Sequence, residues 1–97
     1  MAAHKEGKVE TYFKEQVQAH GGITRKAKWL CRRGCPDQFW AFPRGLGNGR
    51  GLAEIKAFGE PLSPHQDREI GKLRAAGVIV YVIDSFAAVD AFIRRES

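Results

Sequence analysis

The chain has 97 residues, of which 43% are hydrophobic, and a formal net charge of +5. These values predict one compact domain over residues 1–97 and exclude both a pair of domains and a disordered tail. The longest small or apolar run, Ala75–Ile83, is too short to span a bilayer. The first residues lack the hydrophobic stretch of a secretory signal, so we expect a cytoplasmic protein with no membrane partner.

Positive charge is concentrated in one window, from Thr24 to Arg50. The window contains a single acid, Asp37, and seven cations: Arg25, Lys26, Lys28, Arg32, Arg33, Arg44 and Arg50. A basic segment around one acid suits a polyanion that must be brought to a metal, so these cations are candidates for contacts with nucleic-acid phosphates. A solvated basic loop is the alternative that charge alone leaves open.

The first predicted element is an amphipathic helix from Lys5 to His20, ended by a pair of glycines. Its apolar stripe consists of Val9, Tyr12, Phe13 and Val17. Glu10 lies at the edge of this stripe, and Glu6 has nearly the same orientation. Periodicity therefore indicates an acid close to the buried face without choosing between the two.

Three strands are predicted next. Residues 23–29 alternate loosely as a short strand, and residues 38–42 form an aromatic strand. The segment Pro43–Gly51, which contains four glycines, makes a hairpin connection to a third strand over Leu52–Phe58. The glycine-rich segment lacks the lysine and Ser/Thr of a P-loop and no helix follows it, so we expect no nucleotide cofactor.

The second half of the chain predicts helix, strand, helix. Ser63 and Gln66 form a capping box with a proline at the first helical position, and Gly77 ends this helix. Residues 78–83 are apolar throughout, as in a strand covered on both sides, and Asp84 or Ser85 caps a last helix. The order αβββαβα, with a hairpin and then a parallel crossover, predicts a mixed α/β sheet with helices on its faces.

Two acids and a lysine around the hairpin indicate a metal site. In a strand, Glu54 and Lys56 project together while Ile55 points into the core. Folding about Gly47 would place Glu54 opposite Trp40 and Lys56 opposite Gln38, with Asp37 two or three positions from Glu54 and a twist or bulge closing the gap. We predict that Asp37, Glu54 and the Ile55 carbonyl bind Mg²⁺ or Mn²⁺. Lys56 would orient or help to deprotonate a water. An exposed strand carrying an ordinary Glu and Lys is the alternative.

Three short motifs together are more specific than this general pattern: residues 34–37 (Gly-Cys-Pro-Asp), residues 54–56 (Glu-Ile-Lys) and residues 62–66 (Leu-Ser-Pro-His-Gln). They resemble the virus-type replication-repair nuclease (VRR-NUC) family within the PD-(D/E)xK superfamily. The resemblance covers nearly the whole chain. It implies a restriction-endonuclease-like fold and metal-dependent cleavage of DNA phosphodiester bonds.

Small stand-alone members resemble phage-type homodimers that cut branched DNA such as four-way junctions, which implies the bacterial or host-cell cytoplasm. Enzymes of the same fold that act on flaps, ends or plain duplex, and a non-catalytic DNA-binding module, remain alternatives.

The family pattern falls on five residues: Glu10, Asp37, Glu54, Lys56 and Gln66. Glu10 has a plain alternative as a solvated helix residue. Gln66 has one as a capping partner, although it shares its helical face with Ile70 and Leu73 and so points at the sheet.

We expect structural rather than catalytic roles for the cysteines and tryptophans. Cys31 and Cys35 lack the further soft ligands of a zinc site, and we expect free thiols. Cys35 stands where the family pattern more often has an aliphatic residue. Trp29 and Trp40 are predicted core residues, with stacking on a splayed base as the minor alternative.

Overall fold

The computed structural model describes residues 4–28, 33–43, 46–47 and 49–97. Its elements follow the predicted order: α1 (Glu6–Ala19), β1 (Ile23–Lys26), β2 (Gln38–Ala41), β3 (Arg50–Ile55), α2 (Pro64–Ala75), β4 (Val80–Ile83) and α3 (Phe86–Glu96). No helix in the described ranges has the length and apolar character needed to cross a membrane.

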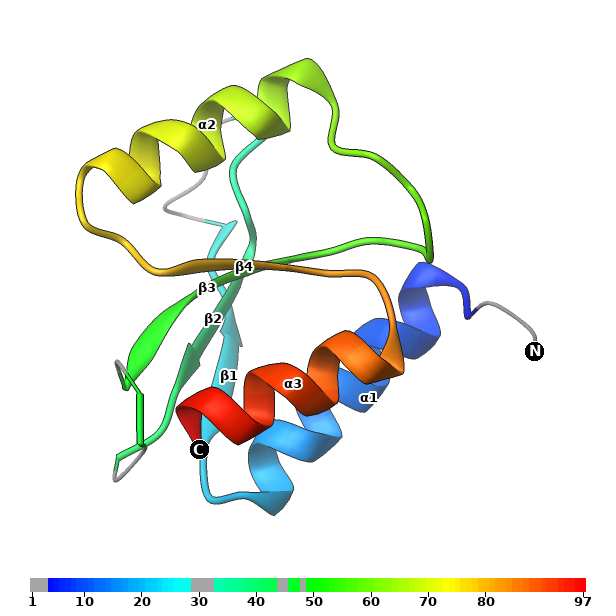
Figure 1. Cartoon of the computed structure of the whole chain (residues 1–97), viewed down its shortest axis with the longest axis vertical. Helices are drawn as coiled ribbons and strands as arrows, with labels where there is room; N and C mark the ends of the chain where they lie inside the picture. Colours follow the sequence, from blue (N-terminus) through cyan, green and yellow to red (C-terminus); the bar gives the residue numbers. More distant parts are fainter. Residues whose placement is uncertain (1–3, 29–32, 44–45, 48) are drawn as a thin grey trace.

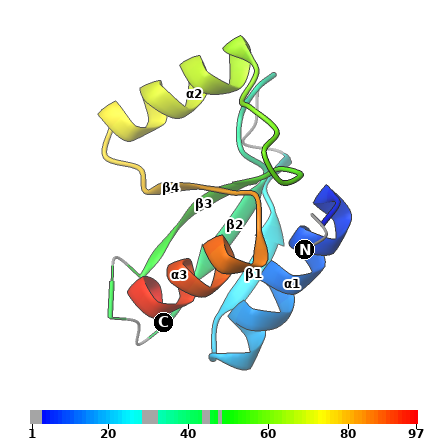
Figure 2. The same cartoon turned by 45° about the vertical axis from the view of Figure 1, so that its right-hand side comes forward.

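The strands form one sheet in the order β1-β2-β3-β4. The first three are antiparallel neighbours, and β4 runs parallel to β3 after the crossover through α2. Helices α1 and α3 lie side by side on one face of the sheet, and α2 covers the other (Figures 1 and 2). The predicted mixed sheet with helices on both faces is confirmed.

Each face of the sheet has its own apolar core. The larger core, beneath α1 and α3, is centred on Trp40, which is fully buried and meets Phe92 edge-on at a ring-centroid distance of 4.9 Å. The smaller core, beneath α2, joins Leu52 to Ile70 and Val80. Trp40 is therefore a core residue as predicted, whereas Trp29 lies outside the described residues.

Alternation along β3 decides which residues face α2. Leu52 belongs to the core beneath α2, while Ala53 and Ile55 belong to the core beneath α1 and α3. Since side chains two apart share a face, Glu54 and Lys56 project towards α2. Ile55 is 4% exposed and points into the larger core, as predicted.

The predicted hairpin register is wrong. Gln38 pairs with Ala53 and Trp40 pairs with Gly51, so the strands are displaced by three residues from the expected pairing. The loop is closed by the Phe42 N–H, which donates to the Gly49 carbonyl at 2.7 Å. The midpoint of the observed register lies before Gly47 rather than on it, and Gly49 adopts φ 89°, a conformation that glycine allows readily.

Two strand predictions also need correction. The first strand ends at Lys26 rather than continuing to residue 29. The fourth strand is at the edge of the sheet and is not covered throughout, because Val82 is 36% exposed. The apolar run of residues 78–83 reflects contact with both cores, through Val80 on one face and Ile83 on the other.

Candidate active site

The observed register places the two acids of the predicted metal site on the same face of the hairpin. Gln38 and Ala53 are the last printed pair of this ladder, and continuing its register by one step places Asp37 opposite Glu54. The negative charge of Asp37 also raises the pKa of Glu54, which agrees with this placement. The Asp37 carbonyl accepts a hydrogen bond from the Ala27 N–H at 2.8 Å, which continues the β1–β2 pairing to this point. Opposed residues on antiparallel strands project to the same face with Cβ atoms about 5 Å apart. This register replaces the twist or bulge that the expected pairing required.

Glu54 has an unusual proton affinity. Burial raises the pKa of its carboxyl, Lys56 lowers it, and the negative charge of Asp37 raises it again, giving a pKa of about 7 instead of 4.5. Ionising a half-buried carboxyl beside a second carboxylate costs free energy, because the charge is partly removed from water and is repelled by its neighbour. The cost falls when a cation binds between the two groups.

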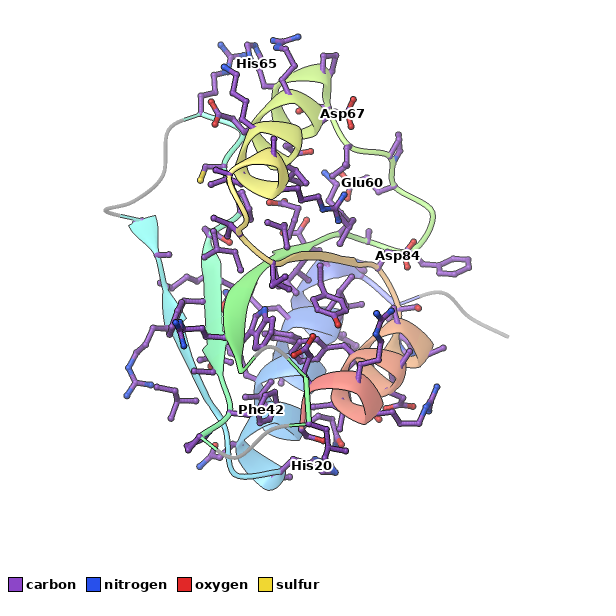
Figure 3. The ribbon with its side chains drawn as sticks, turned by 60° about the vertical axis from the view of Figure 1, so that its left-hand side comes forward. His20, Phe42, Glu60, His65, Asp67 and Asp84 are labelled. Atoms are coloured by element: carbon purple, nitrogen blue, oxygen red, sulfur yellow. The ribbon has the colours of Figure 1, made fainter. Side chains whose placement is uncertain are left out.

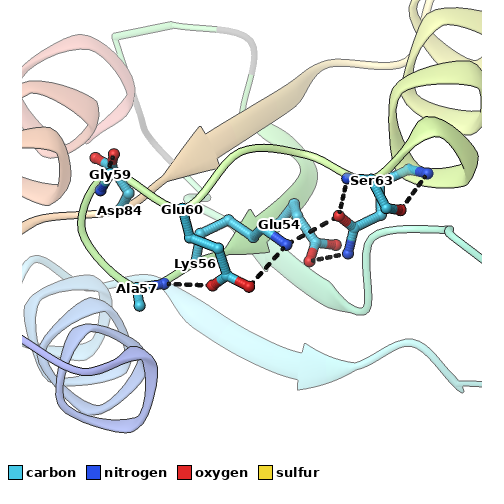
Figure 4. A network of polar contacts seen from close by, with 8 residues as sticks. Glu54, Lys56, Ala57, Gly59, Glu60, Ser63 and Asp84 are labelled. Carbon is cyan, nitrogen blue, oxygen red and sulfur yellow. Dashed lines mark hydrogen bonds and ion pairs between the residues drawn. The ribbon is translucent and has the colours of Figure 1, made fainter.

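Lys56 is the buried cation of the site. It is 6% exposed, and its Nζ donates to Gln66 Oε1 at 2.9 Å and lies 3.6 Å from Glu60 Oε2 (Figure 4). Its backbone N–H donates to the Ile83 carbonyl at 2.8 Å, which fixes the end of β3 against β4. An ammonium group surrounded by acceptors in this way is held in one place rather than free in solvent.

Gln66 connects the start of α2 to the acid and the lysine. Its Nε2 donates to Glu54 Oε2 at 3.2 Å, while its Oε1 accepts from both Lys56 and the Ser63 N–H. Ser63 Oγ in turn accepts from the Gln66 N–H at 3.1 Å, completing the predicted capping box. The capping role and the contact with the carboxylate are therefore both present in one side chain.

Glu10 reaches the site from α1 through a lysine. Lys26 Nζ lies 3.1 Å from Glu10 Oε2 and 3.6 Å from Asp37 Oδ2, so it joins the two acids. Burial raises the pKa of Glu10, but hydrogen bonds from Lys14 and Lys26 outweigh it and the net pKa is lowered. Glu6 is exposed and acts on Glu54 only through its charge. The structure thus connects Glu10 to Asp37 through Lys26, whereas Glu6 acts on Glu54 only at a distance.

Sequence reasoning missed two polar residues around this site. Gln38 is fully buried on the face opposite Glu54, where its Nε2 donates to Glu10 Oε2 at 3.2 Å. Its Oε1 has no hydrogen-bond partner among the described residues. Glu60 accepts from the Ala57 N–H and pairs with Lys56. Strand alternation from Trp40 would have placed Gln38 towards α1, but no sequence signal marks Glu60.

The cations predicted to contact phosphates differ in their surroundings. Arg25, Lys28, Arg33 and Arg50 are exposed, whereas Lys26 is engaged with acids. Arg32 and Arg44 lie outside the described residues, as does Cys31. Cys35 is a free thiol, as predicted.

The donor set suits a hard divalent cation. Asp37 and Glu54 offer carboxylate oxygens, and Asp37 is 45% exposed at its side chain, which leaves room for water ligands. Among the described residues there is no group of three or more His, Cys, Asp or Glu side chains arranged around one point. A cation here would be held by two carboxylates, with backbone and water oxygens completing its shell.

A mixed sheet flanked by helices, with opposed acids and a lysine on paired strands, is the arrangement of a PD-(D/E)xK nuclease. Three comparisons with known proteins narrow this class. No family model matches the chain. A protein of Acyrthosiphon pisum secondary endosymbiont phage 1 named "Putative nuclease p44" is 39% identical over 82 residues, which is 84% of each chain. A solved structure described as a VRR-NUC domain superposes with a TM-score of 0.79 at 39% identity, covering 95% of this chain and 97% of that one. The chain belongs to the virus-type replication-repair nuclease (VRR-NUC) family.

Proposed function

We propose that this nuclease is a metal-dependent, structure-selective DNA endonuclease that resolves four-way junctions as a homodimer. The observation that carries the proposal is the β2–β3 register, whose continuation by one step places Asp37 opposite Glu54, together with the buried Lys56. Two carboxylates form an oxygen site for Mg²⁺ or Mn²⁺, with the Ile55 carbonyl as the proposed third ligand.

The reaction is attack of water on a phosphodiester: a bond forms between the water oxygen and phosphorus, and one P–O ester bond breaks. A bound divalent ion supplies charge stabilisation at the phosphate and favours loss of a proton from water. Lys56 places a positive charge beside the nucleophile and the phosphate oxygens. Gln66 holds Glu54 and Lys56 in fixed relative positions through its two hydrogen bonds. Glu10 holds Lys26 next to Asp37.

Homodimerisation would supply the second active site that one small domain lacks. A four-way junction must be cut on opposed strands, and a twofold dimer carries two identical sites in a symmetric arrangement. The exposed cations Arg25, Lys28, Arg33 and Arg50 can bind backbone phosphates of DNA without reading its sequence.

The test is cleavage of a labelled four-way junction and of the linear duplex with the same arm sequence, in Mg²⁺, Mn²⁺ or EDTA. We expect junction cleavage by the wild type with either metal and none in EDTA. Asp37→Asn should be inactive, whereas Asp67→Asn, an exposed acid on α2, is the matched control and should retain activity.

The other outcomes assign other functions. Equal cutting of duplex and junction would remove junction selectivity and favour an enzyme of flaps, ends or plain duplex. Metal-dependent cleavage unchanged in Asp37→Asn would show that the proposed site is misplaced. Junction binding without any cleavage would indicate a DNA-binding module, and a monomer in sedimentation at working concentrations would remove the dimer.

A further inference from the structure

A second polar pocket lies on the side of α2. It has a volume of about 300 Å³ and is lined by residues from α2 and from the segment before β2: Arg33, His65, Arg68, Glu69 and Lys72. Three of these residues are cations and one is an acid. We propose that this pocket binds a backbone phosphate of the DNA strand that runs through the active site.

The lining residues form one stripe on α2. His65, Arg68 and Lys72 follow the three- and four-residue spacing that puts side chains on a common helical face. Ile70 and Leu73 occupy the face that packs on the sheet, so the cationic stripe is directed away from the core. A stripe of this kind could be an ordinary solvated helix surface. The opposing Arg33, which comes from another part of the chain, makes it a pocket instead.

The segment carrying Arg33 is held tightly against α2. Gly34 has φ 86°, and a Cβ at this position would come within 2.7 Å of the His65 carbonyl carbon and oxygen. Only glycine allows the backbone to approach α2 so closely. Figure 3 shows His65 at the start of α2, next to the segment that leads into β2. The two walls of the pocket are therefore fixed relative to each other.

One hydrogen bond joins two side chains of the pocket. Arg68 Nη2 lies 3.1 Å from His65 Nδ1. A guanidinium can only donate, so His65 Nδ1 is the acceptor in this contact. Arg33, Arg68 and Lys72 carry three positive charges against the one negative charge of Glu69, so the pocket has a net attraction for an anion. Arginine donors match the oxygens of a phosphate in a bidentate manner.

The two walls of the pocket are connected in sequence to the active site. Arg33 precedes Asp37 by one short turn of chain, and His65 is the neighbour of Gln66, which contacts Glu54. A volume at the lower end of the range for ligand sites, with polar walls, suits a phosphate group better than a base. A strand whose scissile phosphate lies at Asp37 and Glu54 would pass this pocket with a neighbouring phosphate.

This inference deepens the proposed function and rests on it, because it assumes a DNA substrate. The test measures binding of a fluorescent four-way junction in EDTA, where nothing is cleaved, over a series of KCl concentrations. Arg68→Gln and Lys72→Gln are compared with Arg94→Gln, an exposed cation on α3 that makes the same charge change on the other side of the sheet.

We expect the salt slope of binding to fall by about 0.9 for Arg68→Gln, with affinity reduced up to about tenfold at 0.1 M salt, because one phosphate contact is lost. Lys72→Gln should act in the same direction and Arg94→Gln should match the wild type. Equal salt slopes for Arg68→Gln, Lys72→Gln and wild type would contradict phosphate binding by the pocket. They would leave the proposed nuclease function unaffected. Wild-type protein that does not bind the junction would overturn both proposals.

Discussion

The variant Glu54→Gln gives a quantitative test of the site, because ionising Glu54 in the folded protein costs free energy. The pKa of Glu54 is raised from 4.5 to about 7, chiefly by burial. A carboxyl whose pKa is raised on folding favours the folded state while it is protonated, below about pH 4.5. That contribution is lost as the pH rises through about 7. At pH 8 the metal-free wild type therefore bears the full cost of an ionised Glu54, whereas glutamine bears none.

The size of the effect follows from the same shift. Moving a pKa from 4.5 to about 7 corresponds to at most about 3 kcal/mol. The carboxyl keeps part of its contact with solvent, so about half of this value, ~1.5 kcal/mol, is expected. In a domain of this length, such a gain raises Tm by about 5 to 10 °C. At pH 4.5 most of the difference should vanish, because both side chains are then largely neutral.

The assay is thermal unfolding followed by circular dichroism at pH 4.5 and pH 8, each with EDTA or Mg²⁺. Glu15→Gln, an exposed acid on α1, is the matched control and should track the wild type. Mg²⁺ at about a hundred times its Kd should stabilise the wild type by about 2.7 kcal/mol at pH 8 and leave Glu54→Gln unchanged. A Tm difference that is the same at both pH values, or Mg²⁺ stabilisation retained in the variant, would refute the reasoning.

Three further predictions concern single side chains. Lys56→Ala should reduce junction cleavage about 100-fold or more while junction binding in EDTA is kept, because its charge acts on the reacting phosphate; equal activity in a single-turnover assay would argue against this role. Gln66→Ala should lower stability to urea by about 1–2 kcal/mol through loss of the capping box and lower cleavage about 10-fold or more through loss of the Glu54 contact. An unchanged urea midpoint would contradict the first part, and unchanged cleavage the second. Trp40→Ala should cost about 3–5 kcal/mol and leave much of the protein unfolded, whereas Trp40→Phe should fold; retention of the wild-type urea midpoint by Trp40→Ala would show that the core is not centred there.

The order of elements could be predicted because each leaves a local signal in the sequence. Hydrophobic periodicity marks α1, and the run from Ser63 to Gln66 marks the start of α2 through its capping chemistry. The parallel return of β4 follows from the length of chain between Leu52 and Val80, which pair in adjacent strands. These signals depend only on nearby residues, so a single sequence carries them in full.

The hairpin register could not be predicted in the same way, and its correction changes how the site works. The expected pairing would have put Asp37 and Glu54 on opposite faces of the sheet, because side chains alternate with a period of two. The observed displacement of three residues is an odd number and therefore returns Asp37 to the face of Glu54. The register depends on the loop between Phe42 and Gly49, whose conformation is not encoded in hydrophobic alternation. The placement of Asp37 and Glu54 on one face therefore follows from the observed register and not from the pairing expected from the sequence.

Lys26 shows why charge counting could not separate binding residues from those that build the site. Arg25 and Lys26 are adjacent cations of β1, but Arg25 pairs with Phe39 and lies on the face of Asp37, while Lys26 pairs with Gln38 and lies towards α1. Lys26 meets Glu10 there and reaches Asp37 around the end of the strand. Arg25 is exposed and remains a candidate for contact with DNA, whereas Lys26 offsets the charge of two acids. The alternation of side chains along β1, which composition does not reveal, separates the two cations.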